Sequence, residues 1–236
     1  MKAVILAGGK GTRLAPYTTV FPKPMMPVGD MPILEVVIRQ LARAGFTDIT
    51  LAVGHLAGLL LAYFGDGTQF GVRLTYARED QPLGTAGPLA GIAGLRDAPF
   101  LVMNGDLLTT LDYGALLAYH QQQRPLATIA THERVVRIDY GVIDSDRAGR
   151  IVAYTEKPTL PYRVSMGIYL FDPAVLDLLT PGAYCDFPEL VQRLLARDLA
   201  VLSYPFTGYW LDIGRPDDYQ QAIDEFERMR EQFLPA

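Results

Sequence analysis

The sequence KAVILAGGKGTRL at residues 2–14 joins an apolar run to a glycine-rich loop. The run Lys2–Ala7 is almost continuously apolar, which is typical of a strand buried on both faces of a parallel sheet. The glycines that follow allow backbone N–H groups to approach a phosphate chain closely. Because ligands of open α/β sheets bind at the carboxyl ends of strands, the stretch predicts a phosphate-binding loop directly after the first strand.

This loop differs from two well-known phosphate loops. Lys10 is followed by Gly11 instead of Ser or Thr, which excludes a P-loop. Leu14 stands where a dinucleotide fingerprint needs its third glycine, which excludes the usual NAD(P)-dependent oxidoreductase unless tight NAD(P) binding is found. A plain tight turn is the simplest alternative. Three glycines followed by Thr12 and Arg13 favour phosphate binding over that alternative.

Strand and helix patterns alternate through the first half of the chain, which predicts right-handed crossovers and a mostly parallel sheet with helices on both faces. The expected strands are Lys2–Ala7, Asp48–Val53, Val72–Ala77 and Phe100–Met103, and the expected helices are Met31–Ala44, His55–Phe64 and Leu116–Gln122. The second half is richer in strands. It predicts strands at Leu126–Thr131, Tyr140–Ile143, Ile151–Glu156, Met166–Phe171 and Ala200–Tyr204, and helices starting at Asp172-Pro173 and over Asp186–Ala196 and Pro216–Phe233. We therefore expect an α/β fold whose second half contains antiparallel strands.

Composition excludes several classes of protein. The 236 residues are 50% hydrophobic and 20% charged, which argues against disorder. The net charge of −5 offers no basic footprint for nucleic acid, and no apolar run reaches the roughly 18 residues of a membrane span. The start of the chain reaches glycine too early for a signal peptide, and the single Cys185 favours a reducing cytoplasm. A polyanionic substrate would need local positive charge, yet only 4 of the 21 basic residues are lysines.

Two of these lysines stand in stiff or charged surroundings. Lys23 is framed by Pro22 and Pro24, which fix the backbone and reduce the entropy lost when the ammonium grips an anion. Lys157 follows Glu156 at a predicted strand end, where an exposed charge pair is the simpler explanation. We assign Lys10 no role beyond local positive charge in the loop. We expect Lys2 at the end of a strand. His55 and His120 are expected in helices and His132 at a strand end.

Two aspartates also follow predicted strands. Asp106 comes after Phe100–Met103, and Asp212 after Tyr209-Trp210-Leu211. If both strands end at one sheet edge, the pair suits a hard cation such as Mg²⁺, which takes one or two carboxylates and fills its shell with phosphate oxygens and water. A strand-end turn residue and a helix cap are the respective alternatives.

Six motifs, in this order, resemble the signatures of the sugar-1-phosphate nucleotidylyltransferases. They are Leu6–Leu14, Pro22-Lys23-Pro24, Asn104-Gly105-Asp106, Tyr140-Gly141-Val142, Glu156-Lys157-Pro158 and Trp210-Leu211-Asp212-Ile213-Gly214. This family transfers a nucleotidyl group from an NTP to a sugar 1-phosphate and releases pyrophosphate. The resemblance implies a Rossmann-like nucleotide-diphospho-sugar transferase fold.

The resemblance also implies a role for each motif residue. Arg13 and Lys23 would be catalytic, and Asp106 and Asp212 would hold Mg²⁺. Contacts to the nucleotide would come from Leu6, Ala7, Gly8, Gly9, Gly11, Thr12, Glu79, Gly84 and Thr85. Contacts to the sugar and its phosphate would come from Asn104, Gly141, Glu156 and Lys157.

The motifs cover nearly the whole chain, so we expect one catalytic domain over residues 1–236. Its nucleotide-binding half would span about residues 1–110 and its sugar-binding half about residues 111–236. We therefore expect no C-terminal β-helix of the kind that follows this domain in some relatives. The charged, solvated face of the last helix neither requires nor excludes a homodimer.

The stretch from Glu79 to Leu89 closely resembles a segment of mannose-1-phosphate guanylyltransferases that faces the nucleobase in the wider family. A carboxylate accepts the N1–H and amino hydrogens of guanine, whereas it would meet the two carbonyls of uracil or thymine. Glu79 with Gly84 therefore favours GTP and a product of the GDP-mannose or GDP-heptose type. A surface acidic cluster at Glu79-Asp80 is the structural alternative.

The sugar and the activity itself have alternatives. Ser165-Met166 replaces an Asn–Ala pair that often contacts the sugar in the family, so mannose, heptose, an amino hexose and a muramic-type sugar all remain open. A uridylyltransferase acting on an amino-sugar or N-acetylmuramic acid 1-phosphate is the same-family alternative. A non-catalytic nucleotide-sugar sensor is the alternative from another class, but such a protein would be expected to lose Arg13, Lys23 or an aspartate.

Overall fold

The computed structural model describes residues 1–78 and 81–235, and its centre is a mixed seven-stranded sheet. In spatial order the strands are β12 (Val201–Phe206), β8 (Ala127–Arg137), β11 (Thr159–Phe171), β6 (Phe100–Asn104), β1 (Lys2–Ala7), β4 (Asp48–Val53) and β5 (Arg73–Arg78). β6, β1, β4 and β5 run parallel, β11 is antiparallel to both β6 and β8, and β12 is parallel to β8. The predicted α/β class with antiparallel strands in its second half is confirmed.

Three two-stranded ribbons complete the strands. They are β2 (Pro27–Val28) with β3 (Met31–Pro32), β7 (Leu107–Thr109) with β13 (Trp210–Asp212), and β9 (Val142–Ser145) with β10 (Ile151–Thr155). The β7–β13 ribbon matters for the site, because it joins the segment after β6 to the segment before the last helix.

The helices are α1 (Ile33–Arg43), α2 (Ala57–Phe64), α3 (Tyr113–Gln123), α4 (Phe187–Leu195) and α5 (Pro216–Phe233). Most match their predicted spans within a few residues. The prediction for α1 began too early, because Met31-Pro32 pairs as β3. The prediction for α2 was wrong at His55, which lies in the loop between β4 and α2. His120 lies in α3 as expected, buried and bonded through Nδ1 to the Thr128 hydroxyl at 2.8 Å.

The core lies on both faces of the sheet. Side chains of β1 alternate between the two layers: Ala3 and Ile5 pack with α1, whereas Val4 packs with α4. A third cluster joins Leu14 of the glycine-rich loop to Leu211, Ile213 and Phe226 near the C-terminus. This third cluster attaches the loop after β1 to α5. Leu14 is fully buried, so the residue that breaks the dinucleotide fingerprint is a core anchor.

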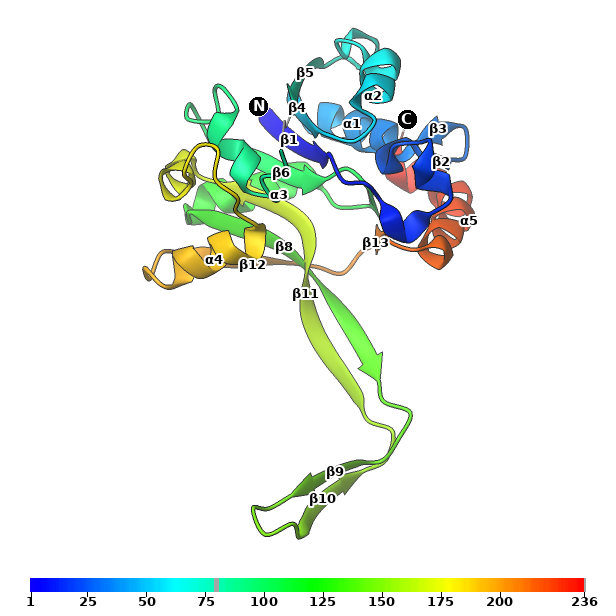
Figure 1. Ribbon diagram of the computed structural model, residues 1–236, viewed down its shortest axis with the longest axis vertical. Coiled ribbons are helices and arrows are strands. Elements are labelled where there is room, and N and C mark those ends of the chain that lie inside the picture. Colours follow the sequence, from blue (N-terminus) through cyan, green and yellow to red (C-terminus); the bar gives the residue numbers. More distant parts are fainter. Residues whose placement is uncertain (79–80, 236) are drawn as a thin grey trace.

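β8 and β11 continue beyond the sheet as a two-stranded ladder, in which Ser165 pairs with Thr131 and Thr159 with Arg137. Figure 1 shows this ladder leaving the body of the molecule and ending in the β9–β10 hairpin. We call residues 133–163 the arm. The predicted strands Leu126–Thr131 and Met166–Phe171 were too short, because sequence patterning did not show that both continue into solvent.

Within the described residues, the longest helices remain too short or too polar to traverse a lipid bilayer.

Two adjacent leucines of α4 provide a test of the core. Leu194 is fully buried, whereas Leu195 is 60% exposed. We expect Leu194→Ala to lower the free energy of unfolding by about 2–5 kcal/mol through lost burial and a cavity. Leu195→Ala should change it by about 0.5 kcal/mol or less. Urea unfolding followed by circular dichroism measures both, and equal losses would contradict this packing.

Candidate active site

The loop after β1 is held in place by its own backbone and by a neighbouring loop. Gly11 adopts a left-handed conformation (φ 61°), and a Cβ there would lie 2.9 Å from the Thr18 methyl group. The Thr18 hydroxyl donates to the Gly11 carbonyl at 2.7 Å. Gly8 and Gly54 approach so closely that a Cβ on Gly54 would lie 3.0 Å from the Gly8 oxygen. These glycines are therefore required by close approach at the carboxyl ends of β1 and β4.

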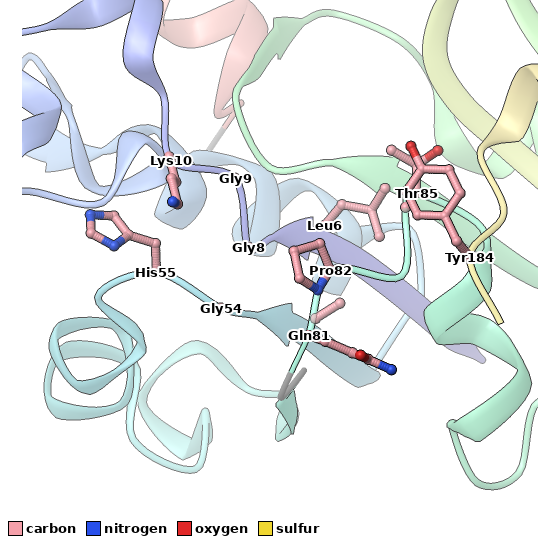
Figure 2. Close-up of a pocket in the computed structure, with 12 residues that line it drawn as sticks. Leu6, Gly8, Gly9, Lys10, Gly54, His55, Gln81, Pro82, Thr85 and Tyr184 are labelled. Carbon is pink, nitrogen blue, oxygen red and sulfur yellow. The ribbon is translucent and has the colours of Figure 1, made fainter. Parts of the chain in front are cut away.

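A cavity of about 560 Å³ opens beside this loop (Figure 2). It contains five of the residues predicted to contact a nucleotide: Leu6, Gly8, Gly9, Gly84 and Thr85. Its other lining residues are Lys10, Ala52, Gly54, His55, Gln81, Pro82 and Tyr184. Of the remaining predicted residues, Ala7 is buried in the core and Gly11 and Thr12 lie further along the loop, outside the described lining. Glu79 lies outside the described residues.

One wall of the cavity is built by two segments far apart in the chain. Gly84 has φ 79°, and a Cβ there would lie 2.5 Å from the Cys185 carbonyl oxygen. The Cys185 N–H donates to the Leu83 carbonyl at 3.0 Å, and the Ala86 N–H donates to the Cys185 carbonyl at 2.9 Å. The Thr85 hydroxyl accepts from the Phe187 N–H at 2.9 Å. Thr85 therefore ties the wall to the start of α4, and Cys185 is buried within it, where burial raises the pKa of the thiol.

The second part of the site gathers the four predicted catalytic and metal-binding residues. Lys23 forms an ion pair with Asp106, and both side chains are largely buried. Asp212 pairs with Leu107 across the β7–β13 ribbon, which places it beside Asp106. The guanidinium of Arg13 lies against Gly214, 3.4 Å from where a Cβ would be. Residues predicted from four separate motifs thus share one edge of the sheet.

The Pro-Lys-Pro frame behaves as the sequence indicates. Residues Lys23–Met25 form a single 3₁₀ turn, closed by the Met25 N–H donating to the Pro22 carbonyl at 2.8 Å. Pro22 and Pro24 are buried on either side of Lys23. The ammonium is therefore presented from a fixed backbone.

The charges of this cluster act on each other. Burial raises the pKa of Asp212, and the neighbouring Asp106 carboxylate raises it further, while Lys23 and Arg13 partly oppose the rise. Two carboxylates held together in this way fit a divalent cation that completes its shell with phosphate oxygens and water. Among the described residues no group of three or more His, Cys, Asp or Glu side chains forms a ready metal site. The protein's own donors would therefore be these two carboxylates.

The four residues predicted to contact the sugar phosphate do not lie together. Asn104 is at the end of β6 in the body, with its amide nitrogen 2.6 Å from where a Cβ on Gly167 would be. Gly141, Glu156 and Lys157 lie at the bend of the arm, between the end of the β8–β11 ladder and the β9–β10 hairpin. There the Lys157 N–H donates to the Tyr140 carbonyl at 3.3 Å. The reason is the β8–β11 ladder, which carries residues 138–158 away from the sheet.

Some cavity residues were missed at the level of sequence. His55 comes two residues after the end of β4, so the rule that ligands bind at the carboxyl ends of strands could have singled it out. Figure 2 shows His55 and Lys10 on the same side of the cavity. Gln81 lies within the segment compared with guanylyltransferases. Tyr184 carries no sequence signal, because it reaches the cavity only through the contacts of Cys185 with Leu83 and Ala86.

Comparison with known proteins adds to this geometry. The family model described as "Nucleotidyl transferase" matches residues 2–228. The chain belongs to the nucleotidyl transferase family. It is 36% identical to a UTP–glucose-1-phosphate uridylyltransferase of Synechocystis, over 94% of this chain and 62% of that protein. It is 35% identical to a mannose-1-phosphate guanylyltransferase of Mycobacterium tuberculosis, over 96% of this chain and 64% of that protein.

The chain thus spans somewhat less than two thirds of the length of these curated relatives. Among solved structures, HddC from Yersinia pseudotuberculosis is similar with a TM-score of 0.74 and 26% identity, over 95% of this chain and 99% of that one. A second HddC structure is a complex with GMP-PN. The fold and the family-level resemblance expected from the motifs are confirmed.

The raised pKa of Asp212 predicts a pH-dependent stability. A carboxyl whose pKa is higher in the folded protein than in the unfolded chain costs stability once it ionises, and this cost grows as pH rises from about 4. Asp212→Asn removes the cost, so its Tm should exceed the wild-type Tm at pH 7, and the difference should fade toward pH 4. Differential scanning calorimetry across this range measures it.

The matched control is Asp217→Asn, in the first turn of α5. An acidic side chain there interacts favourably with the helix N-terminus, so this variant should gain no stability at pH 7. An Asp212→Asn protein less stable than wild type at pH 7 would contradict the placement of Asp212 beside Asp106.

Proposed function

We propose that the protein transfers a nucleotidyl group from an NTP to a sugar 1-phosphate, forming an NDP-sugar and pyrophosphate. The observation that carries this proposal is the cluster of Lys23, Arg13, Asp106 and Asp212 at the sheet edge that also holds the glycine-rich loop and its cavity. Cations beside paired carboxylates suit a reaction between two phosphorylated substrates. Family membership and the names of the relatives support it.

In the proposed reaction an oxygen of the sugar phosphate attacks the α-phosphorus of the NTP in line. The new P–O bond forms as the bond between the α-phosphorus and the bridging oxygen breaks, and pyrophosphate leaves with that oxygen. No protein nucleophile is needed, so catalysis is positioning and neutralisation of charge. Arg13 stabilises the triphosphate and the leaving pyrophosphate, Lys23 the α-phosphate, and Lys157 the phosphate of the attacking sugar. Bound Mg²⁺, held by Asp106 and Asp212, would supply further positive charge to the phosphates.

The proposed nucleotide-binding and sugar-binding roles follow the two halves of the chain. Residues up to about 110 bind the nucleotide and residues from about 111 to 236 bind the sugar, within one domain. The cavity supports this division, since all of its lining residues but Tyr184 come from the first half. The pairing of β6 with β11 joins the halves in one sheet.

We propose GTP as the nucleotide. The carboxylate of Glu79 suits guanine, and the guanylyltransferase relative and the HddC complex with GMP-PN support the choice. The uridylyltransferase relative, at similar identity, supports the alternative of UTP with an amino-sugar or N-acetylmuramic acid 1-phosphate.

For the sugar, we favour mannose or a heptose, giving a GDP-mannose or GDP-heptose type of product. At the position of the usual Asn–Ala pair, Met166 is fully buried and the Ser165 hydroxyl donates to the Tyr169 hydroxyl at 3.0 Å. Neither side chain has the amide group that Asn supplies in the usual pair. This supports sugar contacts that differ from those of relatives with Asn–Ala.

The retained charges argue against a non-catalytic sensor. Arg13, Lys23, Asp106 and Asp212 are all present and gathered, and a sensor has no need to preserve all four. The single buried Cys185 supports our expectation of a reducing, cytoplasmic setting.

Removing one charge of the cluster tests the proposed chemistry. Lys23→Ala and Asp106→Ala should each lower the rate of pyrophosphate release by about 10²–10³, by analogy with the loss of one electrostatic contact to a transition state. Lys2→Ala is the matched control. Lys2 begins β1, at the end of the strand opposite the glycine-rich loop, and its ammonium pairs with Asp48 of β4 at 3.5 Å. Near wild-type turnover in either cluster variant, with folding confirmed by circular dichroism, would contradict the mechanism.

A thermal-shift matrix tests the substrates. GTP, ATP, UTP and dTTP are each combined with Mg²⁺ and a panel of sugar 1-phosphates. We expect GTP to stabilise most, by about 2.7 kcal/mol when present at a hundred times its Kd. A preference for UTP or dTTP would overturn the guanine assignment and favour the uridylyl alternative.

A further inference from the structure

The arm carries three of the four residues proposed to contact the sugar phosphate, Gly141, Glu156 and Lys157, away from the catalytic charges. Thr159 precedes Gly167 by eight residues on β11, which at a strand rise of about 3.3 Å places the bend of the arm roughly 26 Å from the sheet edge. Figure 1 shows the arm pointing away from the body. Lys157 therefore cannot hold a phosphate at the Lys23–Asp106 cluster of its own chain in this arrangement.

The bend is already organised as a binding surface. Tyr154 lies so close to Gly141 that a Cβ there would come within 2.1 Å of the Tyr154 hydroxyl, which donates to Glu156 Oε2 at 2.8 Å. Glu156 and Lys157 are both more than half exposed, 3.9 Å apart. Gly141, Glu156 and Lys157 thus form one group on the arm, apart from both Asn104 and the catalytic cluster.

The root of the arm is fixed to the body. His132 Nε2 bonds the Gly208 carbonyl at 3.1 Å, and the Arg134 guanidinium stacks 5.2 Å from the Trp210 ring centroid. The Trp210 indole N–H in turn donates to the Met166 carbonyl at 3.1 Å. Folding the arm back onto its own site would break these contacts together with part of the β8–β11 ladder.

The arm also exposes apolar surface that its own chain does not cover. Of the 18 large hydrophobic side chains exposed in the described part of the chain, nine lie in the arm: Val135, Val136, Tyr140, Ile143, Ile151, Val152, Tyr154, Leu160 and Tyr162. So many uncovered apolar side chains on one slender hairpin mark an interaction surface.

The body offers an apolar groove that suits this surface. It encloses about 860 Å³ and contains no charged lining residue among those described, and Phe21 and Met25 place it beside the loop that carries Lys23. Each chain thus presents one apolar arm and one apolar groove. In a two-fold dimer the arm of each chain can cover the groove of its partner, so that neither apolar surface stays exposed to solvent.

We propose that the active form is an arm-exchanged dimer, in which the arm of each chain brings Glu156 and Lys157 to the Asp106–Asp212 site of its partner. This inference rests on the proposed function, because it assigns the sugar-phosphate contacts of that reaction to a second copy of the chain.

Two co-expressed chains with different affinity tags test the exchange. The heterodimer of an Asp106→Asn chain with a Lys157→Ala chain, isolated by sequential capture of both tags, contains one intact site if arms are exchanged. It should release pyrophosphate at about half the wild-type rate per dimer, whereas each variant homodimer should lose about 10²-fold or more. An inactive heterodimer would overturn the exchange.

The control heterodimer carries the same two substitutions on one chain, paired with a wild-type chain. Exchange leaves this dimer without an intact site, so it should be inactive, whereas half activity would mean that each chain completes its own site. A Lys157→Ala homodimer with wild-type turnover would also overturn the inference, since the arm would then contribute nothing to the reaction.

Analytical ultracentrifugation provides a readout that does not need activity. The wild-type chain should sediment as a dimer at micromolar concentration, and Val152→Asp with Tyr154→Asp should shift it to monomer. A monomeric wild type would overturn the exchange while leaving the proposed reaction intact. If the wild-type dimer releases no pyrophosphate with any substrate pair, the proposed function fails instead.

Discussion

Two carboxylates held side by side at a partly buried sheet edge determine how the site is built. Asp106 follows β6 and Asp212 ends β13, and the pairing of Asp212 with Leu107 in the β7–β13 ribbon holds the two backbones side by side. Their repulsion is offset by Lys23 and Arg13, which come from the loops after β1. Those loops must therefore stay close to the carboxylates. The buried Leu14, packed with Leu211 and Ile213, and the Pro22–Pro24 frame keep them there.

Much of this arrangement could be predicted from the sequence, because it depends on local signals. The continuous apolar run of β1 predicted a buried strand, and the positions of Asp106 and Asp212 after predicted strands were compatible with their meeting at one sheet edge. The Pro-Lys-Pro turn and the Asp172 cap, whose side chain accepts from the Ala174 N–H at 2.9 Å, are equally local. Such features need only nearest neighbours in sequence or the general rule for strand ends.

The remainder depends on contacts between distant segments. Thr85 bonds to α4 across about a hundred residues, and this contact brings Tyr184 to the cavity without any periodic pattern. The arm is the clearer case. Val135, Val136 and Ile151 are of residue types common in core strands, yet all three are exposed in the structure. The predicted strand Leu126–Thr131 ends before Val135, whereas β8 continues to Arg137. A pattern of apolar residues predicts that they are buried. It does not predict whether they are buried by the same chain or by another one.

The distribution of lysine connects these observations. Lys23 lies in the body within a closed ion pair, and Lys157 lies on the arm, with only an exposed and long contact to Glu156. In our proposal Lys23 binds the α-phosphate of the NTP and Lys157 binds the phosphate of the sugar. A compact ammonium fits these positions better than the broad guanidinium of the arginines elsewhere in the chain. If the arm belongs to a partner's site, the two cations share one reaction centre only in the dimer. In that proposed dimer, assembly would control the second phosphate contact, because the body alone lacks the cation that orients the acceptor.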